Sequence, residues 1–549
     1  MTAALGGVQR SFEVVAGLSG WRRRGLALLL GAVAAGALPP FHLVFLLIPA
    51  FSGLVWLIAS ASGGRRAFMD AWWFGIGHGA AGTFWIAHSL TIDIASHGWL
   101  IPIAVIGFAA VLGLFAAIAG WLHFLLRRPG TLPSGADALI LAGVWTGTEW
   151  LRSWLFTGFP WNLMGTVWTF ADAMVQPAAL FGVFGLSLIT VAATAAPAAL
   201  AGRSRRPWLS SAFALAFLGG VWGGGAYHLY DAETVFAPGV HLRLVQPNIA
   251  QADKWRKSRR PTHVARQIDM SMMAAEKAPD GQPGPEPTHV IWAETAVPYV
   301  LGREPALIRA LAHAAPQEGA LLTGSLRIEA DPRSPDNRPQ VFNSFYVLEA
   351  SGRIAATYDK HHLVPFGEYV PFQEVLGFLK ITEGRGNFSA GPGPRVLEVQ
   401  GLPPFTPLIC YEIIFPAAVI PKTGDGPDGG KGDAPAPRAR WMLNITNDAW
   451  FGVTPGPYQH LAAARLRAVE EGVPVVRVAN TGISAVIDPW GRIVASLGLD
   501  RAGTVDAPLP EPIEQRTVFA RLGNGPALLL ALLLALIGWV SARRAAPPV

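Results

Sequence analysis

Residues 407–416 read PLICYEIIFP and place the one cysteine of the chain directly after an apolar run. The run predicts a buried strand, so Cys410 stands where that strand ends, and Glu412 follows two residues later. The carboxyl ends of strands are where open α/β sheets gather functional residues. On general grounds, however, a lone thiol beside Leu408 and Ile409 is more often an inert buried residue. Cys410 therefore needs partners elsewhere in the chain before it indicates chemistry.

Two other motifs supply such partners. In IWAETAVP (291–298), Glu294 follows an apolar strand, and in YDKHHLVPFGEYVPF (358–372), Lys360 follows another. Singly, Glu294 could be a solvated loop residue, and Lys360 could form a surface pair with Asp359. Together with Cys410 they provide a nucleophile, a proton acceptor and a cation. A thiol with a pKa of about 8.5 needs such neighbours to react as a thiolate at neutral pH.

The polar segment around these motifs has the pattern of an α/β or α+β layered core, because short β-branched runs alternate with helical stretches. The predicted strands are 241–245, 288–292, 319–323, 344–348, 354–358, 406–409, 442–445, 475–479, 484–487 and 493–496. The predicted helices are 262–277, 303–315, 416–420 and 458–471. Residues 421–440, rich in Gly, Pro and Asp, predict a flexible surface insertion away from the chemistry.

The flanking sequence is of a different kind. The chain has 549 residues, of which 51% are hydrophobic and only 15% charged, whereas soluble domains carry about 25% charged residues. A membrane-crossing helix needs about 20 mainly apolar residues. Eight segments are candidates: 25–38, 41–61, 71–90, 100–126, 136–151, 174–201, 210–227 and 526–540.

Arginines mark every second connection between these segments, and the intervening turns around Pro39–His42 and Thr91–His97 carry none. The basic positions are Arg22, Arg23, Arg24, Arg65, Arg66, Arg127, Arg128, Arg203, Arg205, Arg206, Arg543 and Arg544. By the positive-inside rule this alternation predicts an even number of spans with both termini in the cytoplasm. The polar segment then lies on the outer side of the inner membrane. Basic residues spread over helix ends, rather than gathered on one surface, argue against nucleic-acid binding.

Residues 149–168, EWLRSWLFTGFPWNLMGTVW, combine aromatic residues with Gly and Pro. Two readings stay open: an interfacial loop or re-entrant arm, and an aromatic belt that anchors neighbouring helices. Glu149 and Arg152 are three residues apart, so on a helix they face the same side and could form an ion pair.

In order and context, Glu294, Lys360 and Cys410 resemble the Glu–Lys–Cys triad of the nitrilase superfamily. With apolar helices before and after, and with FTGFPW at 156–161, the chain resembles the bacterial apolipoprotein N-acyltransferases. The resemblance implies a polytopic α-helical membrane domain of about eight spans and an extracytoplasmic nitrilase-like α/β/β/α sandwich. The domains would cover residues 1–230, 231–520 and 521–549, the last a single helix with a cytoplasmic tail.

The resemblance also implies an activity: transfer of a fatty acyl chain from the sn-1 position of a glycerophospholipid to the amine of a diacylglyceryl-cysteine lipoprotein. Cys410 would carry the acyl group as a thioester, Glu294 would move the proton, and Lys360 would stabilise the oxyanion. The implied partners are a phospholipid donor, a diacylated apolipoprotein acceptor and the bilayer. We expect a monomer in the inner membrane, with no cofactor and no metal.

Further site residues are expected around this triad. Glu368 and Glu412 would orient Lys360 and its loop; for Glu412 a second reading stays open, that of a helix-start residue favoured by the helix dipole. Candidates for the acyl site or its oxyanion contacts are Tyr411 and Asn343. Candidates for the lipid entrance are Trp154, Phe156, Phe159 and Trp161, with Trp450 and Phe451 as a mobile apolar arm.

Two other functions compete with this one. A membrane-tethered nitrilase-like amidase would use the same triad, with water completing the reaction. A transporter or sensor with an outer binding domain is disfavoured, because the apolar segments show no internal repeat and few polar residues.

Overall fold

In the computed structural model, the described residues are 2–275, 284–330, 339–370, 387–421 and 437–544. The chain divides into two compact units, Met1–Ala232 with Thr517–Val549, and Glu233–Arg516. Each has its own buried apolar core. The predicted insertion at 421–440 lies almost wholly outside the described residues.

The regular elements in the described residues of the first unit are all helices. Its elements are α1 (Thr2–Gly17), α2 (Gly20–Ala35), η1 (Val44–Leu46), α3 (Leu47–Ala59), α4 (Gly64–Thr83), α5 (Ile86–Thr91), α6 (Ile94–His97), η2 (Gly98–Leu100), α7 (Ile101–Leu126), α8 (Gly135–Arg152), η3 (Leu155–Thr157), η4 (Met164–Trp168), α9 (Asp172–Val175), α10 (Ala178–Ala195), η5 (Ala196–Ala201), α11 (Leu209–His228), α17 (Val518–Leu522) and α18 (Gly525–Arg544).

Four stretches of the described residues are long and apolar enough to cross a membrane: Ile94–Leu126, Ala178–Ala201, Leu209–His228 and Gly525–Arg544. They match four of the predicted segments. The predicted segments 41–61 and 71–90 are each divided between two elements. Most of α3 is buried inside the unit, so its apolar residues serve helix packing. The number of spans therefore stays a prediction.

Close helix packing in this unit depends on glycine. A Cβ atom on Gly31 would lie 1.9 Å from the carbonyl oxygen of Phe74, and one on Gly77 would lie 2.0 Å from that of Leu28. Helices α2 and α4 can approach this closely only because both positions lack a side chain. Small residues at helix contacts are typical of membrane bundles.

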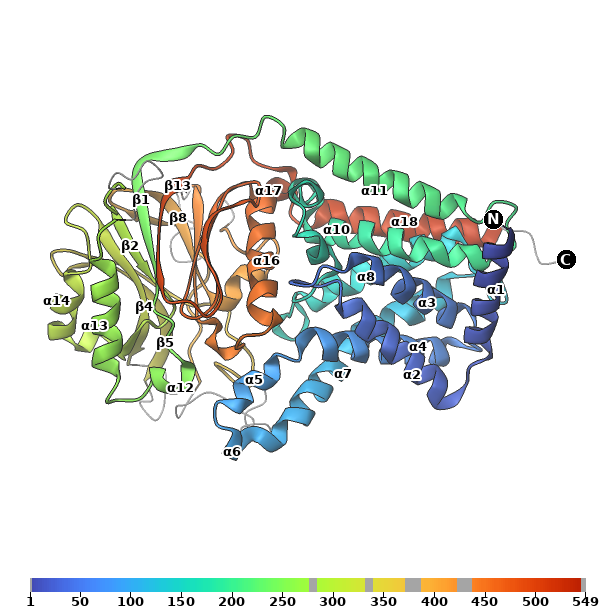
Figure 1. The fold of residues 1–549 in the computed structure, drawn as a ribbon, viewed down its shortest axis with the longest axis horizontal. Helices are drawn as coiled ribbons and strands as arrows, with labels where there is room; N and C mark the ends of the chain where they lie inside the picture. The colour runs from blue at the N-terminus through green and yellow to red at the C-terminus, as the bar shows by residue number, and fades with distance from the viewer. Residues whose placement is uncertain (1, 276–283, 331–338, 371–386, 422–436, 545–549) are drawn as a thin grey trace. The chain divides into compact units, whose positions relative to one another are not determined.

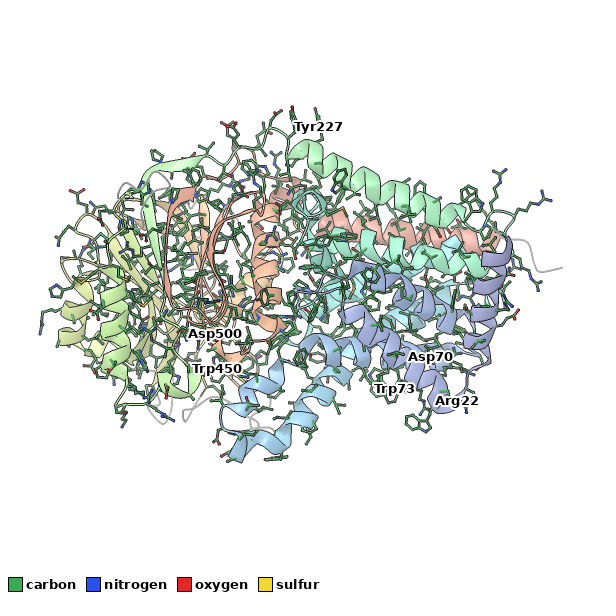
Figure 2. All side chains as sticks on the ribbon, in the orientation of Figure 1. Arg22, Asp70, Trp73, Tyr227, Trp450 and Asp500 are labelled. Atoms are coloured by element: carbon green, nitrogen blue, oxygen red, sulfur yellow. The ribbon has the colours of Figure 1, made fainter. Side chains whose placement is uncertain are left out.

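Two of the arginines that we expected at solvated helix ends are instead buried in ion pairs. Arg23 on α2 lies 2.7 Å from Asp70 on α4, and both side chains are nearly inaccessible. Figure 2 labels Asp70 and the neighbouring Arg22 on this part of the ribbon. Arg127 donates a 3.0 Å hydrogen bond to Asp137 at the start of α8. Ion pairs between packed helices, in addition to orientation in the membrane, therefore explain part of the arginine pattern.

The second unit has two β-sheets. In its described residues the first sheet follows the order β13-β1-β2-β4-β5-β6, with β3 on β4, and the second follows β12-β11-β10-β9-β8-β7. The strands are β1 (Phe236–Gln246), β2 (His289–Trp292), β3 (Val297–Val300), β4 (Ala320–Glu329), β5 (Gln340–Glu349), β6 (Ile354–Asp359), β7 (Leu397–Val399), β8 (Leu402–Ile409), β9 (Trp441–Thr446), β10 (Val475–Ala479), β11 (Ser484–Ile487), β12 (Ile493–Leu497) and β13 (Gly503–Pro510).

Helices cover the outer faces of the two sheets, which gives four layers. The helical elements are α12 (Gln251–Lys254), α13 (Arg260–Ser271), η6 (Leu301–Arg303), α14 (Pro305–Ala312), η8 (Cys410–Ile414), η9 (Asp448–Trp450) and α16 (Pro455–Glu471). Figure 1 shows α13 and α14 beside β2 and β4, and α16 on the far side of β8.

The period of two along the strands creates these layers. Leu242 and Leu244 of β1 face the other sheet and join a core with Phe405 and Leu443. Val245, the next residue, faces the opposite way and joins a second core beneath α13 and α14.

All ten predicted strands are confirmed: 475–479 and 484–487 match β10 and β11 at both ends, and the other eight have shifted ends. The predicted helix at 416–420 is wrong: the chain forms the short helix η8 at Cys410–Ile414 and then turns, with Ala417 at a φ of 61°. The predicted helix 262–277 ends at Ser271, and 303–315 is shortened to Pro305–Ala312. Strands β3, β7 and β13 were not expected.

Candidate active site

Cys410 occupies a sharp bend between a strand and a short helix. It follows the last residue of β8 and begins η8. Its φ of 53° is in the left-handed region, which costs a non-glycine residue about 1–2 kcal/mol. The side chain is half-buried. Such a bend holds a side chain at the carboxyl end of a parallel strand, because β8 runs parallel to β9.

Glu294 lies in the turn between β2 and β3, at the carboxyl end of another parallel strand. It is 7% exposed. The side-chain amide of Asn343, on β5, donates a 2.7 Å hydrogen bond to Glu294 Oε1. The predicted candidates Glu294 and Asn343 are therefore in direct contact.

Lys360 follows β6 and is buried. Its Nζ atom lies 2.9 Å from Glu368 Oε2 and 3.7 Å from Glu294 Oε1. Asn343 also donates a 3.0 Å hydrogen bond to Glu368. Burial alone would lower the pKa of Lys360, but Glu368, Glu294 and Cys410 outweigh burial and raise it. Lys360 is therefore a fixed cation at neutral pH.

The Cys410 thiol is electrostatically coupled to this cluster. Burial raises the pKa of Cys410, and Glu294 raises it further, while Lys360 and a hydrogen bond with Thr446 act in the opposite direction. The thiol is therefore protonated at rest. It becomes a nucleophile when a base removes its proton at the moment of attack.

Glu412 organises the loop that follows Lys360. Its carboxylate accepts hydrogen bonds from the backbone N–H groups of His361 (2.8 Å), His362 (3.1 Å) and Ile409 (2.7 Å), and from the hydroxyl of Tyr358 (3.0 Å). The loop-orienting role expected for Glu412 has this geometric basis. One of its oxygens also accepts the bond from Ile409, the residue before η8, and which of the two expected roles Glu412 has stays a prediction.

Tyr411 lies beside the same loop. It is 5% exposed, and its ring centroid lies 5.8 Å from that of His362 and 5.1 Å from that of Phe415. The residue packs the bend that carries Cys410. Its assignment to the acyl site stays a prediction.

The backbone of Cys410 rests on a buried polar cluster that sequence reasoning missed. Asn444 Nδ2 lies 3.3 Å and His460 Nε2 3.2 Å from the carbonyl oxygen of Cys410. The other ring nitrogen of His460 lies 3.0 Å from Asp448, which forms a 2.6 Å ion pair with Arg477. Only the ITND segment at 445–448, directly after a predicted strand, gave a signal for this cluster.

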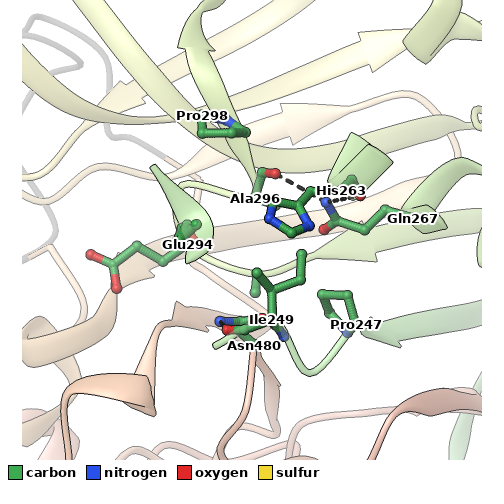
Figure 3. Close-up of a pocket in the computed structure, with 10 residues that line it drawn as sticks. Pro247, Ile249, His263, Gln267, Glu294, Ala296, Pro298 and Asn480 are labelled. Atoms are coloured by element: carbon green, nitrogen blue, oxygen red, sulfur yellow. Dashed lines mark hydrogen bonds between the residues drawn. The ribbon is translucent and has the colours of Figure 1, made fainter. Parts of the chain in front are cut away.

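A second buried lysine was also missed. Lys254, at the end of α12, donates hydrogen bonds to the carbonyl oxygen of Glu294 (3.0 Å) and to Thr295 Oγ1 (2.7 Å). It also lines a small cavity behind the Glu294 turn, with about 10 Å³ of solvent-accessible space. Figure 3 shows the Glu294 carboxylate pointing away from the cavity residues His263 and Gln267.

The predicted lipid-entrance residues differ in environment. Trp154 is 52% exposed and Phe156 78%. Trp161 is 4% exposed and stacks on Phe159, with ring centroids 5.9 Å apart. In the second unit, Phe451 contacts the ring of His460 edge-on, with centroids 6.0 Å apart.

Trp450, labelled in Figure 2, ends η9 beside Phe451. The roles predicted for these six residues stay predictions. In the described residues, no group of three or more His, Cys, Asp or Glu side chains could hold a metal ion.

Comparison with known proteins agrees with this two-unit organisation. Residues 30–196 match the family model described as the apolipoprotein N-acyltransferase N-terminal domain, and residues 242–515 match that of carbon-nitrogen hydrolase. A protein of Rhodopseudomonas palustris named apolipoprotein N-acyltransferase is 40% identical over 548 residues, which cover 96% of each chain. The chain belongs to the apolipoprotein N-acyltransferase family.

Other members of the family match in the same way. A protein of Brucella suis biovar 1 with the same name is 40% identical over 514 residues, covering 90% of this chain and 91% of that relative.

Nit3 of Saccharomyces cerevisiae, a solved member of the nitrilase superfamily, has a TM-score of 0.33 and 18% identity and covers 51% of this chain and 93% of its own. The family assignment does not depend on that structure. The resemblance predicted from the motifs is thus confirmed, together with a nitrilase-like carbon-nitrogen hydrolase domain.

Proposed function

We propose that the protein is a lipoprotein N-acyltransferase. It moves an acyl chain from the sn-1 ester of a glycerophospholipid to the free amine of a diacylglyceryl-cysteine, by way of a thioester on Cys410. The homologues named apolipoprotein N-acyltransferase and the carbon-nitrogen hydrolase domain support the acyl-transfer class. The residue roles rest on the geometry around Cys410.

In the first half-reaction, Glu294 accepts the proton of the Cys410 thiol, and the sulfur attacks the ester carbonyl carbon. The tetrahedral intermediate collapses as the C–O bond of the ester breaks. Glu294 returns the proton to the leaving alkoxide, so the lysophospholipid departs as an alcohol and Cys410 holds the acyl group. Splitting one difficult transfer into two steps lets the donor leave before the acceptor enters.

In the second half-reaction, the neutral amine of the lipoprotein attacks the thioester carbonyl carbon. Glu294 accepts the proton that the nitrogen loses, and the C–S bond breaks to give the amide. The thiolate of Cys410 then recovers its proton from Glu294, which restores the resting site.

In both half-reactions Lys360 stabilises the oxyanion. The buried ion pair with Glu368 holds its ammonium in place, and a fixed cation in a water-poor site is effective against developing negative charge. The single observation that carries the proposal is this convergence: a thiol at a strand-end bend, electrostatically coupled to a buried carboxylate and a buried lysine that lie 3.7 Å apart.

The proposal includes a membrane setting. The first unit, which includes α18, anchors the protein with about eight spans, both termini are cytoplasmic, and the catalytic unit faces the periplasm. The arginine alternation along the sequence supports this orientation. Both substrates are lipids, so a catalytic unit tied to the membrane at both ends lets each arrive by lateral diffusion.

The experiment that tests the chemistry is mass spectrometry of the purified protein after exposure to phospholipid vesicles. We expect an acyl adduct on Cys410 that hydroxylamine removes and that the Cys410→Ala variant lacks. Since Cys410 is the one cysteine in the chain, no second thiol can confuse the result. An adduct on another residue, or none in an active preparation, would contradict the proposal.

An assay with and without the lipopeptide acceptor distinguishes the transferase from the competing hydrolase. With labelled phospholipid and a diacylated lipopeptide, the transferase yields N-acylated peptide. A hydrolase yields free fatty acid whether or not the peptide is present.

A further inference from the structure

The loop that carries Glu294 is held by three donors from distant parts of the chain. Asn343 bonds the carboxylate. Lys254 bonds the carbonyl oxygen of Glu294 and the hydroxyl of Thr295. Gln267 donates a 3.0 Å hydrogen bond to the carbonyl oxygen of Ala296, which Figure 3 shows as a dashed line.

The loop needs this restraint because its backbone is strained. Thr295 has a φ of 43°, in the left-handed region that costs β-branched residues most. A conformation of this kind persists only where the surroundings over-determine it. The hydrogen bond from Lys254 to the hydroxyl of Thr295 restrains the side chain of the strained residue itself.

The charge of Lys254 also matters to the cluster. Around Lys360, Glu294 and Glu368 are two carboxylates beside one cation, so without Lys254 this group would carry a net negative charge. Asp448, which also raises the pKa of Cys410, is paired with Arg477 and adds no net charge. A negative cluster opposes formation of a thiolate. Lys254 balances it. Burial lowers the pKa of Lys254 to about 8, even though Glu294 and Cys410 act to raise it, so it remains mainly a cation at neutral pH.

We infer that Lys254 is a positioning residue for acyl transfer. It fixes the Glu294–Thr295 turn that carries the base, and it neutralises the cluster in which the thiolate forms. This inference rests on the proposed function, since it presupposes that Glu294 is the base. The site then has two lysines with different tasks. Lys360 stabilises the oxyanion, and Lys254 holds the base Glu294 in position.

The test compares Lys254→Met with Lys254→Arg in the full-length protein in detergent micelles. Lys257→Met is the matched control, because Lys257 is exposed and lies three residues further along the chain. The first readout is the rate at which iodoacetamide alkylates the protein, which reports on the single thiol. The second is kcat and KM for N-acylation of a diacylated lipopeptide.

We expect Lys254→Met to lower kcat about 100-fold, the scale of a misplaced catalytic group, with KM changed less than about twofold. Alkylation should slow about 10-fold or more, since the thiolate forms less readily beside a net negative charge. Lys254→Arg should recover part of both rates, and Lys257→Met should change neither. A purely structural lysine would lower the unfolding temperature without slowing alkylation of the folded fraction.

Should Lys254→Met not fold, Thr295→Val serves as the second variant, because it removes the hydroxyl acceptor and keeps the charge. It should reduce kcat less than the lysine variant. Rates of Lys254→Met or Thr295→Val equal to wild type would overturn the inference. Glu294→Gln separates the two proposals: if it abolishes transfer while Lys254→Met does not, only the role of Lys254 is wrong. If Glu294→Gln remains active, the proposed function itself fails.

Discussion

The Nδ2 atom of Asn343 lies 2.7 Å from the Oε1 atom of Glu294. The same nitrogen lies 3.0 Å from Glu368 Oε1, so one amide group joins the two carboxylates around Lys360. An amide donor between two carboxylates keeps them at a fixed separation and offsets part of their mutual repulsion.

Removing that amide should therefore impair catalysis more than folding. We expect Asn343→Ala to lower kcat for lipopeptide N-acylation about 100-fold, and Asn343→Asp to lower it at least as far by adding a third carboxylate. The check is a kcat measurement beside a thermal unfolding curve. Gln340→Ala, on the same strand, is the control and should retain activity. Full activity of Asn343→Ala would remove this residue from the site.

Glu368 should matter through Lys360. Glu368→Gln keeps the size of the side chain but removes the anion 2.9 Å from Lys360 Nζ, so the ammonium is free to move toward Glu294. We expect kcat to fall about 10–100-fold with little change in KM. The exposed Glu318→Gln is the matched control. A rise in KM alone would indicate a substrate-binding role instead.

The sequence predicted most of the layered fold because its strands are apolar and β-branched. Strand β3 was missed because Pro298 lies within it and proline disfavours strands. The proline-containing β13, which pairs with β1 from more than 250 residues away, was missed for the same reason. The false helix at 416–420 arose because a local pattern cannot predict the left-handed φ of Ala417.

Some residues of the candidate site could also be predicted from the sequence, and others could not. Cys410, Glu294 and Lys360 could be found because each is a reactive residue type directly after a predicted strand. Lys254 and His460 could not, because their importance depends on contacts 40 and 50 residues away in the chain. Local patterns carry no information about such pairings.

Gly324, on β4, should be required for the position of Glu294. A Cβ atom there would lie 2.4 Å from the backbone nitrogen of Thr295. We expect Gly324→Ala to displace the turn, with about 1–3 kcal/mol of destabilisation and about a 100-fold loss of kcat. Thermal unfolding and lipopeptide assays measure the two effects. Gly302→Ala, where a Cβ has open space, should have neither.

The exposed aromatic residues of the 149–168 segment should affect lipid capture. We expect the double variant Trp154→Ser, Phe156→Ser to raise KM for phospholipid vesicles about 100-fold or more, because each aromatic ring buried in lipid contributes about 1.5–3 kcal/mol and every 1.4 kcal/mol is a tenfold change. The unfolding temperature should not change. Val14→Ser, also at an exposed apolar position, is the control. An unchanged KM would leave the segment as a helix anchor.

Glu412 should make stability depend on pH. Burial alone would raise the pKa of Glu412, but His361 and the hydrogen bond from the Ile409 N–H outweigh burial and hold it below its ordinary value of 4.5. A carboxyl group with a lowered folded-state pKa contributes its full stabilisation above the unfolded value. That contribution is lost as the pH falls through the folded value.

We therefore expect Glu412→Gln to destabilise the protein by about 2–4 kcal/mol at pH 7, since Gln cannot replace a carboxylate that accepts bonds from several donors. Below pH 4.5 the gap between wild type and variant should narrow, because the wild-type carboxyl group becomes protonated. Thermal unfolding in detergent from about pH 3.5 to 7.5 spans this range. Glu398→Gln, at an exposed position on β7, should follow the wild-type curve throughout. A gap that stays constant or widens on acidification would show that the loop after Lys360 does not depend on the charge of Glu412.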